Sequence, residues 1–262
     1  MARIVPLFSS SKGNMTYVGS SSSGVLIDAG CGIRALREAM FCSSLDISSI
    51  KAVCITHEHT DHIKGISSIL RHLRLPVYAT KGTLDHLTKT GCVEYERGLF
   101  EISSKPFEVA GMQVGAFKTS HDAADSCGFS ITASDGRTVG FCTDLGCVTQ
   151  EVFKGLSGCN LIMVESNYDR KMLAEGSYPP SLKRRIESPT GHLENTVSAD
   201  LIDRLIESGT AQVVLAHLSE QNNRPDLAHN KVRKILSERG KTASDYALYV
   251  ALPVTKGENI IF

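Results

Sequence analysis

The sequence predicts an α+β protein in which helices cover the faces of β-sheet. Short apolar runs rich in β-branched residues alternate with segments of helical periodicity along much of the chain. The region from Tyr95 to Val148 is richer in strand patterns. A dense group of histidine and aspartate residues directly follows one apolar run, where sheets flanked by helices usually hold their ligands.

The N-terminal part shows strands and helices in turn. Strands are expected at residues 4–8, 15–19 and 24–30, followed by a helix at 33–41. A buried strand at 52–55 precedes a helix at 63–73, and a strand at 76–80 precedes a helix at 81–90. This alternation predicts helices packed on one face of a sheet.

The C-terminal part begins with strands at 107–109, 112–119, 127–133 and 138–142, two of them joined by a hairpin turn at 134–137. Further strands are expected at 160–165, 212–219 and 246–252, and helices at 149–156, 196–208 and 227–239. A polar helical stretch at 169–188 is broken by Pro179 and Pro180. No linker or fixed-period repeat divides the chain, so we expect one domain over residues 1–262.

Composition excludes several classes of protein. Lys and Arg together number 28, as do Asp and Glu, so the net charge is zero. This balance argues against a uniformly basic nucleic-acid binder but leaves room for a local basic strip. No apolar run approaches the roughly 18 residues of a membrane helix, and Pro6 comes too early for a signal peptide. Eight cysteines without a C-x-x-C pair fit reduced thiols, so we expect a cytoplasmic protein without a membrane partner.

The polar group after the strand at 52–55 has the pattern His57-x-His59-x-Asp61-His62. In an extended loop, residues two apart point the same way, so His57 and His59 can reach one ion. Asp61 and His62 lie where the loop turns into a helix, and they can reach a second ion nearby. Imidazole and carboxylate together suit Zn²⁺, Fe or Mn²⁺, so this pattern predicts a metal site.

Two more strand ends carry the same residue types. His121 follows the strand at 112–119, and Asp144 follows the strand at 138–142 within a T-D-x-G pattern. With H-x-H-x-D-H upstream, we expect both side chains to be metal ligands.

These motifs resemble the signature of the metallo-β-lactamase fold superfamily over nearly the whole chain. The likeness is greatest to a bacterial branch of small exonuclease-like hydrolases, often called YycJ or WalJ, and is more distant to ribonuclease Z. It implies a four-layer αββα sandwich, with two mixed β-sheets face to face and helices outside. It also implies a dinuclear metal site at one edge of the sandwich.

The resemblance further implies a ligand set, in which His217 at the end of a later strand is the last member. It places His57, His59 and His121 on one ion, Asp61, His62 and His217 on the other, and Asp144 between them. We expect two divalent ions, with zinc as the first choice and manganese or iron as alternatives. Such a pair lowers the pKa of water toward neutrality, and Asp61 would also orient the attacking water.

Other residues gain a role only through the resemblance. Asp28, at the end of the strand at 24–30, would support the metal loop through hydrogen bonds. Glu165 and His192 resemble the acid–histidine pair of ribonuclease Z, in which the histidine donates a proton to the leaving oxygen. Glu194 departs from the branch, which usually has serine there. Its carboxylate would repel a phosphate backbone unless it points outward.

These features predict a metal-dependent hydrolase, in the first place a phosphodiesterase or 5′→3′ exonuclease whose substrate is single-stranded DNA or RNA. One alternative keeps the metal site but hydrolyses a small ester or amide, as a lactonase, thioesterase or β-lactamase-like enzyme. Another is a non-catalytic, metal-bound partner protein. The basic run Lys183-Arg184-Arg185 fits either an exposed helix face or a strip that contacts phosphates.

Overall fold

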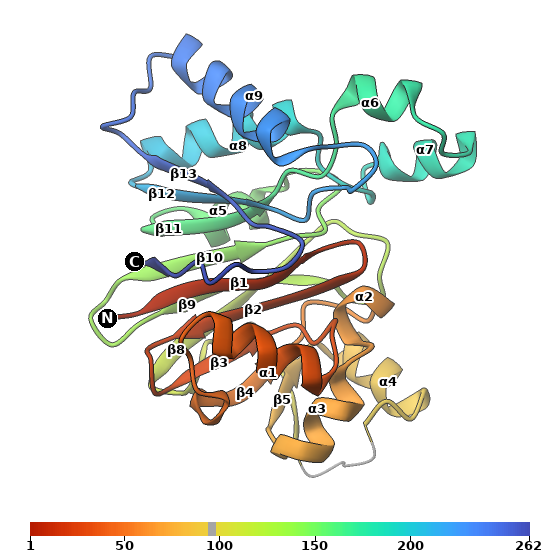
Figure 1. Cartoon of the computed structure of the whole chain (residues 1–262), viewed down its shortest axis with the longest axis vertical. Helices are drawn as coiled ribbons and strands as arrows, with labels where there is room; N and C mark the ends of the chain where they lie inside the picture. The colour runs from red at the N-terminus through yellow and green to blue at the C-terminus, as the bar shows by residue number, and fades with distance from the viewer. Residues whose placement is uncertain (94–97) are drawn as a thin grey trace.

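Two seven-stranded sheets pack face to face, and helices cover the outer face of each (Figure 1). This computed structural model describes residues 1–93 and 98–262. The start of the predicted strand-rich region, at Tyr95, lies outside the described residues.

The first sheet contains the N-terminal strands and one strand from the C-terminus. Its order is β14 (Ile260–Ile261), β1 (Arg3–Ser10), β2 (Gly13–Gly19), β3 (Gly24–Ile27), β4 (Ile50–Cys54), β5 (Val77–Ala79) and β6 (Leu99–Glu101). Strands β14 to β3 are antiparallel to their neighbours, whereas β3 to β6 run parallel.

The second sheet repeats this arrangement with later strands. Its order is β13 (Ala247–Val250), β12 (Gln212–Ala216), β11 (Leu161–Glu165), β10 (Thr138–Cys142), β9 (Cys127–Thr132), β8 (Met112–Lys118) and β7 (Phe107–Val109). Strands β13 to β10 run parallel, and β10 to β7 are antiparallel. In both sheets, the carboxyl ends of parallel strands therefore meet at one edge.

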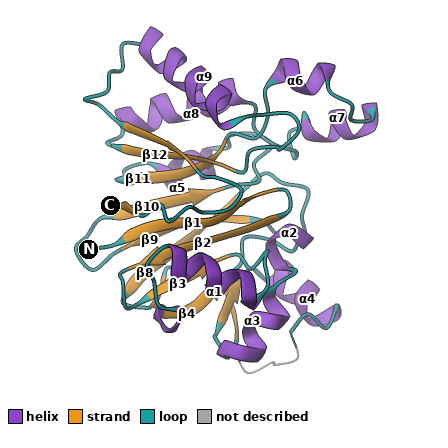
Figure 2. Ribbon diagram, viewed as in Figure 1, coloured by secondary structure: helices purple, strands orange, loops and turns teal. Residues whose placement is uncertain are grey.

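Helices lie on both sides of the paired sheets (Figure 2). Beside the first sheet are α1 (Ile33–Cys42), the short 3₁₀ helix η1 (Ile47–Ser49), α2 (Thr60–Ile63), α3 (Ile66–Leu73) and α4 (Lys81–Lys89). Beside the second are α5 (Gln150–Leu156), α8 (Asn195–Glu207) and α9 (Pro225–Glu238), with α6 (Arg170–Glu175) and α7 (Pro180–Ile186) projecting at one end. None of the helices in the described ranges is long and apolar enough to cross a membrane.

The apolar side chains form layers because successive strand residues face opposite sides of a sheet. In β3, Ile27 belongs to the buried cluster between the two sheets, whereas Leu26 packs among the helices outside the first sheet. In β11, Met163 faces the other sheet and Val164 belongs to the outer cluster with α5, α8 and α9. These alternating faces confirm the predicted four-layer αββα sandwich.

The predicted helix at 63–73 was wrong at its start, because α2 ends at Ile63 and a separate helix, α3, begins at Ile66 after a break at Gly65. The Gly65 N–H donates to Ala29 O at 2.8 Å, and a Cβ at this position would lie 1.9 Å from Cys31 O. The backbone of residues 29–31 thus packs directly on the break. Strand β6 was not predicted, because it is only three residues long and two of the three, Phe100 and Glu101, are exposed, so it shows no buried apolar run.

Candidate metal centre and active site

The seven predicted ligands come from strand ends and from α2. Residues His57 and His59 follow β4, Asp61 and His62 lie on α2, and His121, Asp144 and His217 follow β8, β10 and β12. These segments meet at the edge from which α2, α6 and α7 project, on the right in Figure 1. The structure brings all seven residues together, in three overlapping groups whose ligand atoms lie within 4.8 Å of one another.

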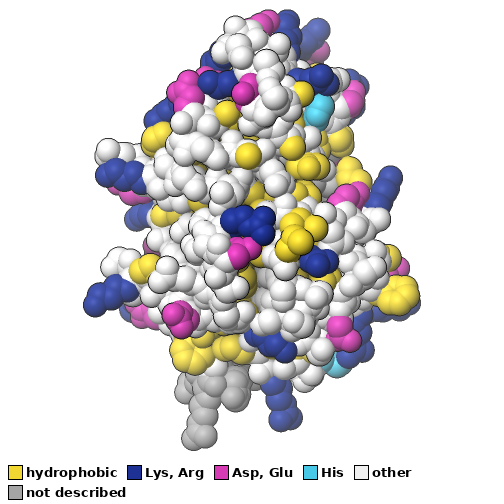
Figure 3. Space-filling model, turned by 90° about the vertical axis from the view of Figure 1, so that its left-hand side faces the viewer, with side chains coloured by type: hydrophobic (Ala, Val, Ile, Leu, Met, Phe, Trp, Pro, Cys, Tyr) yellow, Lys and Arg dark blue, Asp and Glu magenta, His cyan; other side chains and the backbone are white. Residues whose placement is uncertain are grey.

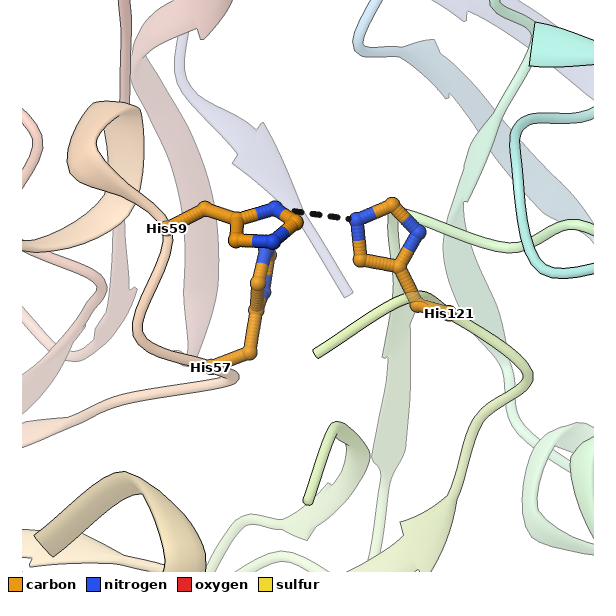
Figure 4. A group of neighbouring side chains, drawn as sticks. All are labelled: His57, His59 and His121. Carbon is orange, nitrogen blue, oxygen red and sulfur yellow. Dashed lines mark hydrogen bonds between the residues drawn. The ribbon is translucent and has the colours of Figure 1, made fainter. Parts of the chain in front are cut away.

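The first group contains His57, His59 and His121 (Figure 4). His59 Nδ1 lies 3.2 Å from His121 Nε2. Two ligands of a tetrahedral zinc ion at about 2.0–2.1 Å are roughly 3.3 Å apart, so this spacing fits a shared ion. The other ring nitrogens are occupied, because His59 Nε2 contacts Asp122 O at 3.2 Å and His121 Nδ1 contacts Gly191 O at 3.0 Å.

The second group contains Asp61, His62 and His217. Asp61 Oδ2 lies 3.3 Å from His62 Nε2 and 3.6 Å from His217 Nε2. Asp144 stands between the two groups, since its Oδ2 is 3.2 Å from His62 Nε2 and its Oδ1 is 3.7 Å from His121 Nε2. Asp144 therefore lies where the family resemblance implies a carboxylate between two ions.

Three buried polar atoms in these groups have no hydrogen-bond partner among the described residues: His57 Nε2, His217 Nε2 and Asp144 Oδ2. A buried polar atom without a partner costs free energy, so such atoms are normally satisfied. All three belong to predicted ligands, and imidazole nitrogens and a carboxylate oxygen are suitable donors for a divalent ion. The residues present therefore fit a pair of metal ions.

The charges of the candidate ligands also favour a bound cation. Burial lowers the pKa of His57 well below its ordinary value, so this imidazole is neutral and able to bind a metal. Burial opposes protonation of His217 as well, but Asp144, Asp61 and Glu165 raise its pKa to about 10. These three carboxylates favour a positive charge at this point, and a divalent cation can supply it.

Asp28 supports the metal loop, as the resemblance implied. Its Oδ2 lies 2.8 Å from His62 Nδ1, and its Oδ1 accepts the backbone N–H of Thr56 at 2.8 Å. The carboxylate thus fixes the His62 ring so that Nε2 faces Asp61 and Asp144. The side chains of Asp28 and His62 are almost fully buried, which keeps competing water away.

Asn14 is a site residue that the sequence did not identify. Its Nδ2 donates to Asp61 Oδ2 at 2.9 Å and lies 3.1 Å from His62 Nε2. The turn between β1 and β2, which Ser11 and Lys12 form, brings Asn14 to the second ligand group. The signal in the sequence was the turn Ser11-Lys12-Gly13-Asn14, which resembles a Ser-Gly-Asn turn of the YycJ branch but whose role the sequence alone left open.

Glu165 and His192 also meet, and they share a third partner. Glu165 Oε1 lies 2.8 Å from Nδ1 of His192 and 2.8 Å from Nδ1 of His217. Its Oε2 accepts the backbone N–H groups of Leu145 at 2.9 Å and Leu193 at 3.0 Å. This fully buried carboxylate is ionised, because its histidine partners lower its pKa to about 2 although burial alone would raise it.

Glu194 does not present a free negative charge that would repel a phosphate backbone. Its Oε1 accepts a hydrogen bond from Lys231 Nζ at 2.8 Å, and the same lysine contacts Asp169 Oδ2 at 3.2 Å. Lys231 comes from α9, so the carboxylate is directed to that helix and its charge is compensated there.

Three site residues adopt the left-handed backbone conformation that favours glycine. The φ angles are 61° for Asp28, 57° for Asp144 and 54° for His217. A residue other than glycine in this region costs on the order of 1–3 kcal/mol, and such positions concentrate at functional sites. Here the turn after each strand is what directs the side chain to the common edge.

Comparison with known proteins supports the family resemblance that the sequence motifs show. A family model described as a beta-lactamase superfamily domain matches residues 24–218. The chain is 36% identical to an exodeoxyribonuclease YycJ of Bacillus anthracis, over 89% of each chain. It is 29% identical to an exodeoxyribonuclease WalJ of Streptococcus pneumoniae, over 95% of this chain and 94% of that one. The crystal structure of zinc-bound PqqB from Methylobacterium extorquens has the same fold, with a TM-score of 0.72 over 99% of this chain and all of that one, at 16% identity.

Proposed function

The chain belongs to the metallo-β-lactamase fold superfamily and is a metal-dependent hydrolase, and on this premise we propose that it is a phosphodiesterase that digests single-stranded DNA or RNA from the 5′ end. The observation that carries the proposal is the contact of 2.8 Å between His192 Nδ1 and Glu165 Oε1, directly beside the two ligand groups. Through this contact, Glu165 holds His192 as a proton donor next to residues that would bind water-activating metal ions.

The candidate ligands would hold two divalent ions, with His57, His59 and His121 on one side, Asp61, His62 and His217 on the other, and Asp144 between. When bound, such ions supply Lewis acidity and make water nucleophilic at neutral pH. Asp61 is the least buried of these carboxylates, so it can orient the attacking water as well as bind. Zinc is the first candidate, with manganese or iron as alternatives.

We assign to His192 the protonation of the leaving oxygen. Its ring centre is 5.2 Å from that of His121 and 5.3 Å from that of His217, so it faces both ligand groups. Glu165 engages Nδ1, which leaves Nε2 for the substrate. Hydrolysis of a nucleic-acid phosphodiester expels a sugar alkoxide, a poor leaving group that needs a proton, whereas a lactone or thioester needs one less.

The relatives named exodeoxyribonuclease support a polynucleotide substrate. A chain of zero net charge has to bind nucleic acid through local features rather than a general positive field. All eight cysteines are free thiols, which agrees with the cytoplasmic location that we propose for an enzyme acting on nucleic acid.

The experiment is to incubate purified protein with Mn²⁺ or Zn²⁺ and single-stranded oligonucleotides labelled at either end, with bis-p-nitrophenyl phosphate in parallel. Digestion from the 5′ end releases the 5′ label at once as a mononucleotide and shortens the 3′-labelled strand step by step. The reverse pattern would reject the polarity. If all phosphodiesters stay intact while a lactone, thioester or β-lactam is hydrolysed, the proposed substrate class is wrong.

A further inference from the structure

The basic run on α7 divides into three different environments. Lys183 Nζ donates to the backbone oxygen of Ala174 at 2.6 Å, within the projecting α6–α7 segment. Arg184 is exposed and makes no ion pair with any described residue. Arg185 instead forms a two-pronged ion pair with Asp122, from Nε to Oδ2 at 2.6 Å and from Nη2 to Oδ1 at 2.9 Å. Only Arg185 is therefore directed to the metal-site loops.

Asp122 connects this arginine to the first ligand group. It directly follows His121, and its backbone oxygen lies 3.2 Å from His59 Nε2. Its Oδ1 is 3.5 Å from His121 Nε2. Asp122 thus stands between the guanidinium of Arg185 and two candidate ligands, His59 and His121. The hydrogen bonds to Asp122 and the charges of Asp122, Asp61 and Asp144 raise the pKa of Arg185, although partial burial opposes this.

The end of α7 is fixed to the site by backbone contacts, so Arg185 has a defined place. The N–H of His192 donates to Ile186 O at 2.9 Å, and the N–H of Asp122 donates to Thr190 O at 3.0 Å. Gly191 packs so closely that a Cβ there would lie 2.2 Å from Arg185 O. The turn that positions the proton donor His192 therefore also positions Arg185.

The arginine keeps capacity for a ligand. Of its five N–H groups, two are used by Asp122, which leaves three, and its side chain is 48% exposed. A planar guanidinium held by one carboxylate is well suited to bind a phosphate on its free side. Figure 3 shows the face that carries the chain ends, away from this arginine, where basic and acidic side chains are mixed.

We propose that Arg185, oriented by Asp122, is a phosphate-binding subsite for the substrate phosphate next to the one that is cleaved. The inference rests on the proposed function and specifies its substrate class as a chain with at least two phosphates. Arg185 then favours a polynucleotide over a diester with a single phosphate, because only the polynucleotide fills both positions.

The test compares Arg185→Ala and Arg185→Lys with Arg184→Ala, a control that removes the same charge from the neighbouring position. The first readout is the ratio of kcat/KM for a 5′-phosphorylated oligonucleotide to kcat/KM for bis-p-nitrophenyl phosphate. A lost charge-assisted hydrogen bond lowers this ratio about tenfold or more in Arg185→Ala. Arg185→Lys keeps the charge and recovers part of the loss, and Arg184→Ala stays within about twofold of the wild type.

The second readout is binding of a phosphorothioate oligonucleotide, measured by fluorescence anisotropy over a range of salt concentrations, with and without manganese. In Arg185→Ala, affinity falls and the slope of log Kd against log salt becomes shallower by about 0.7, as for one lost phosphate contact on a single strand. The inference is overturned if both diester substrates lose activity equally, or if Arg184→Ala matches Arg185→Ala. If the wild type hydrolyses no phosphodiester, the proposed function fails, and the binding data alone decide whether Arg185 contacts phosphate.

Discussion

His192 and His217 share one oxygen of a buried carboxylate, since each Nδ1 lies 2.8 Å from Oε1 of Glu165. One of these histidines is the proposed proton donor and the other a proposed metal ligand. Glu165 thus fixes the distance between the leaving-group side and the metal side of the site. Changes at His192 and at Glu165 should therefore have different consequences.

His192→Ala should impair hydrolysis only where the leaving group needs a proton. On an oligonucleotide, kcat falls by about 10²- to 10⁴-fold, the usual contribution of a general acid. On bis-p-nitrophenyl phosphate the loss is much smaller, because nitrophenolate leaves without a proton. Steady-state kinetics with both substrates checks this, and equal losses would show that His192 has another role.

Glu165→Gln should impair both substrates, because it weakens the support of His217 as well as that of His192. Replacing the ionised carboxylate by an amide removes the charge that both imidazoles contact, and it leaves one oxygen where Glu165 uses two, so either the imidazoles or the N–H groups of Leu145 and Leu193 lose their acceptor. We expect kcat to fall for bis-p-nitrophenyl phosphate also, together with the content of bound metal after dialysis. A variant that behaves like His192→Ala would contradict the bridging role.

Substitutions in the two ligand groups should remove different metal ions. His121→Ala loses metal from the first group and His217→Ala from the second, whereas Asp144→Ala weakens both. Elemental analysis after dialysis measures the remaining equivalents. His72→Ala is the control, because that histidine contacts Ser68 O within α3 and lies outside the groups. A similar loss in this control would argue against the assignment.

Removal of metal should also destabilise the protein. An ion present at a hundred times its Kd stabilises the folded state by about 2.7 kcal/mol, so a chelator should lower Tm and added Zn²⁺ or Mn²⁺ should restore it. Thermal unfolding of the Asp144→Ala variant should respond little to either treatment. An unchanged Tm in the wild type would count against bound ions.

The candidate ligands could be proposed from the sequence because residue types that bind metals are concentrated at strand ends, although His217 was added only through the family resemblance. His57, His59, Asp61 and His62 form one continuous motif, and a strand–loop pattern is visible in the letters alone. The αββα layering came from the resemblance that this motif carries. The structure then confirmed it through the alternating faces of strands such as β3 and β11.

The supporting contacts could not be predicted, because they join residues that are distant in sequence. Asn14 and Asp61 are 47 positions apart, and Arg185 and Asp122 are 63 positions apart. Nothing local in either member of these pairs indicates the other. The left-handed conformation of His217 is equally invisible, since the backbone turn is imposed by the strands around it.

Gly30→Ala should disturb the second ligand group through the backbone. A Cβ at Gly30 would lie 1.9 Å from Asp61 O and 2.4 Å from Asn14 N, and neither backbone atom can move freely. We expect a destabilisation of about 1–3 kcal/mol in urea unfolding, with weaker metal binding. Gly115→Ala is the control, since its Cβ would meet the rotatable Ser130 Oγ at 3.0 Å. Equal effects in both variants would reject this explanation.

Asp169→Asn should change the pH dependence of stability. Asp169 caps α6 and contacts Lys231 Nζ at 3.2 Å. Burial alone would raise its pKa, but the cap and the lysine lower it below the ordinary value. Its charge therefore stabilises the folded state fully above about pH 4, and this stability is lost as the pH falls through the folded pKa. Asparagine keeps the cap but not the charge, so we expect the free energy of unfolding to fall by about 1 kcal/mol at pH 7 and this difference to vanish in acid.

Urea unfolding from pH 7 downward measures this difference, with the exposed Asp226→Asn as a control that stays within a few tenths of a kcal/mol throughout. A difference from the wild type that persists undiminished below the folded pKa would mean that the cap, and not the ion pair with Lys231, was lost.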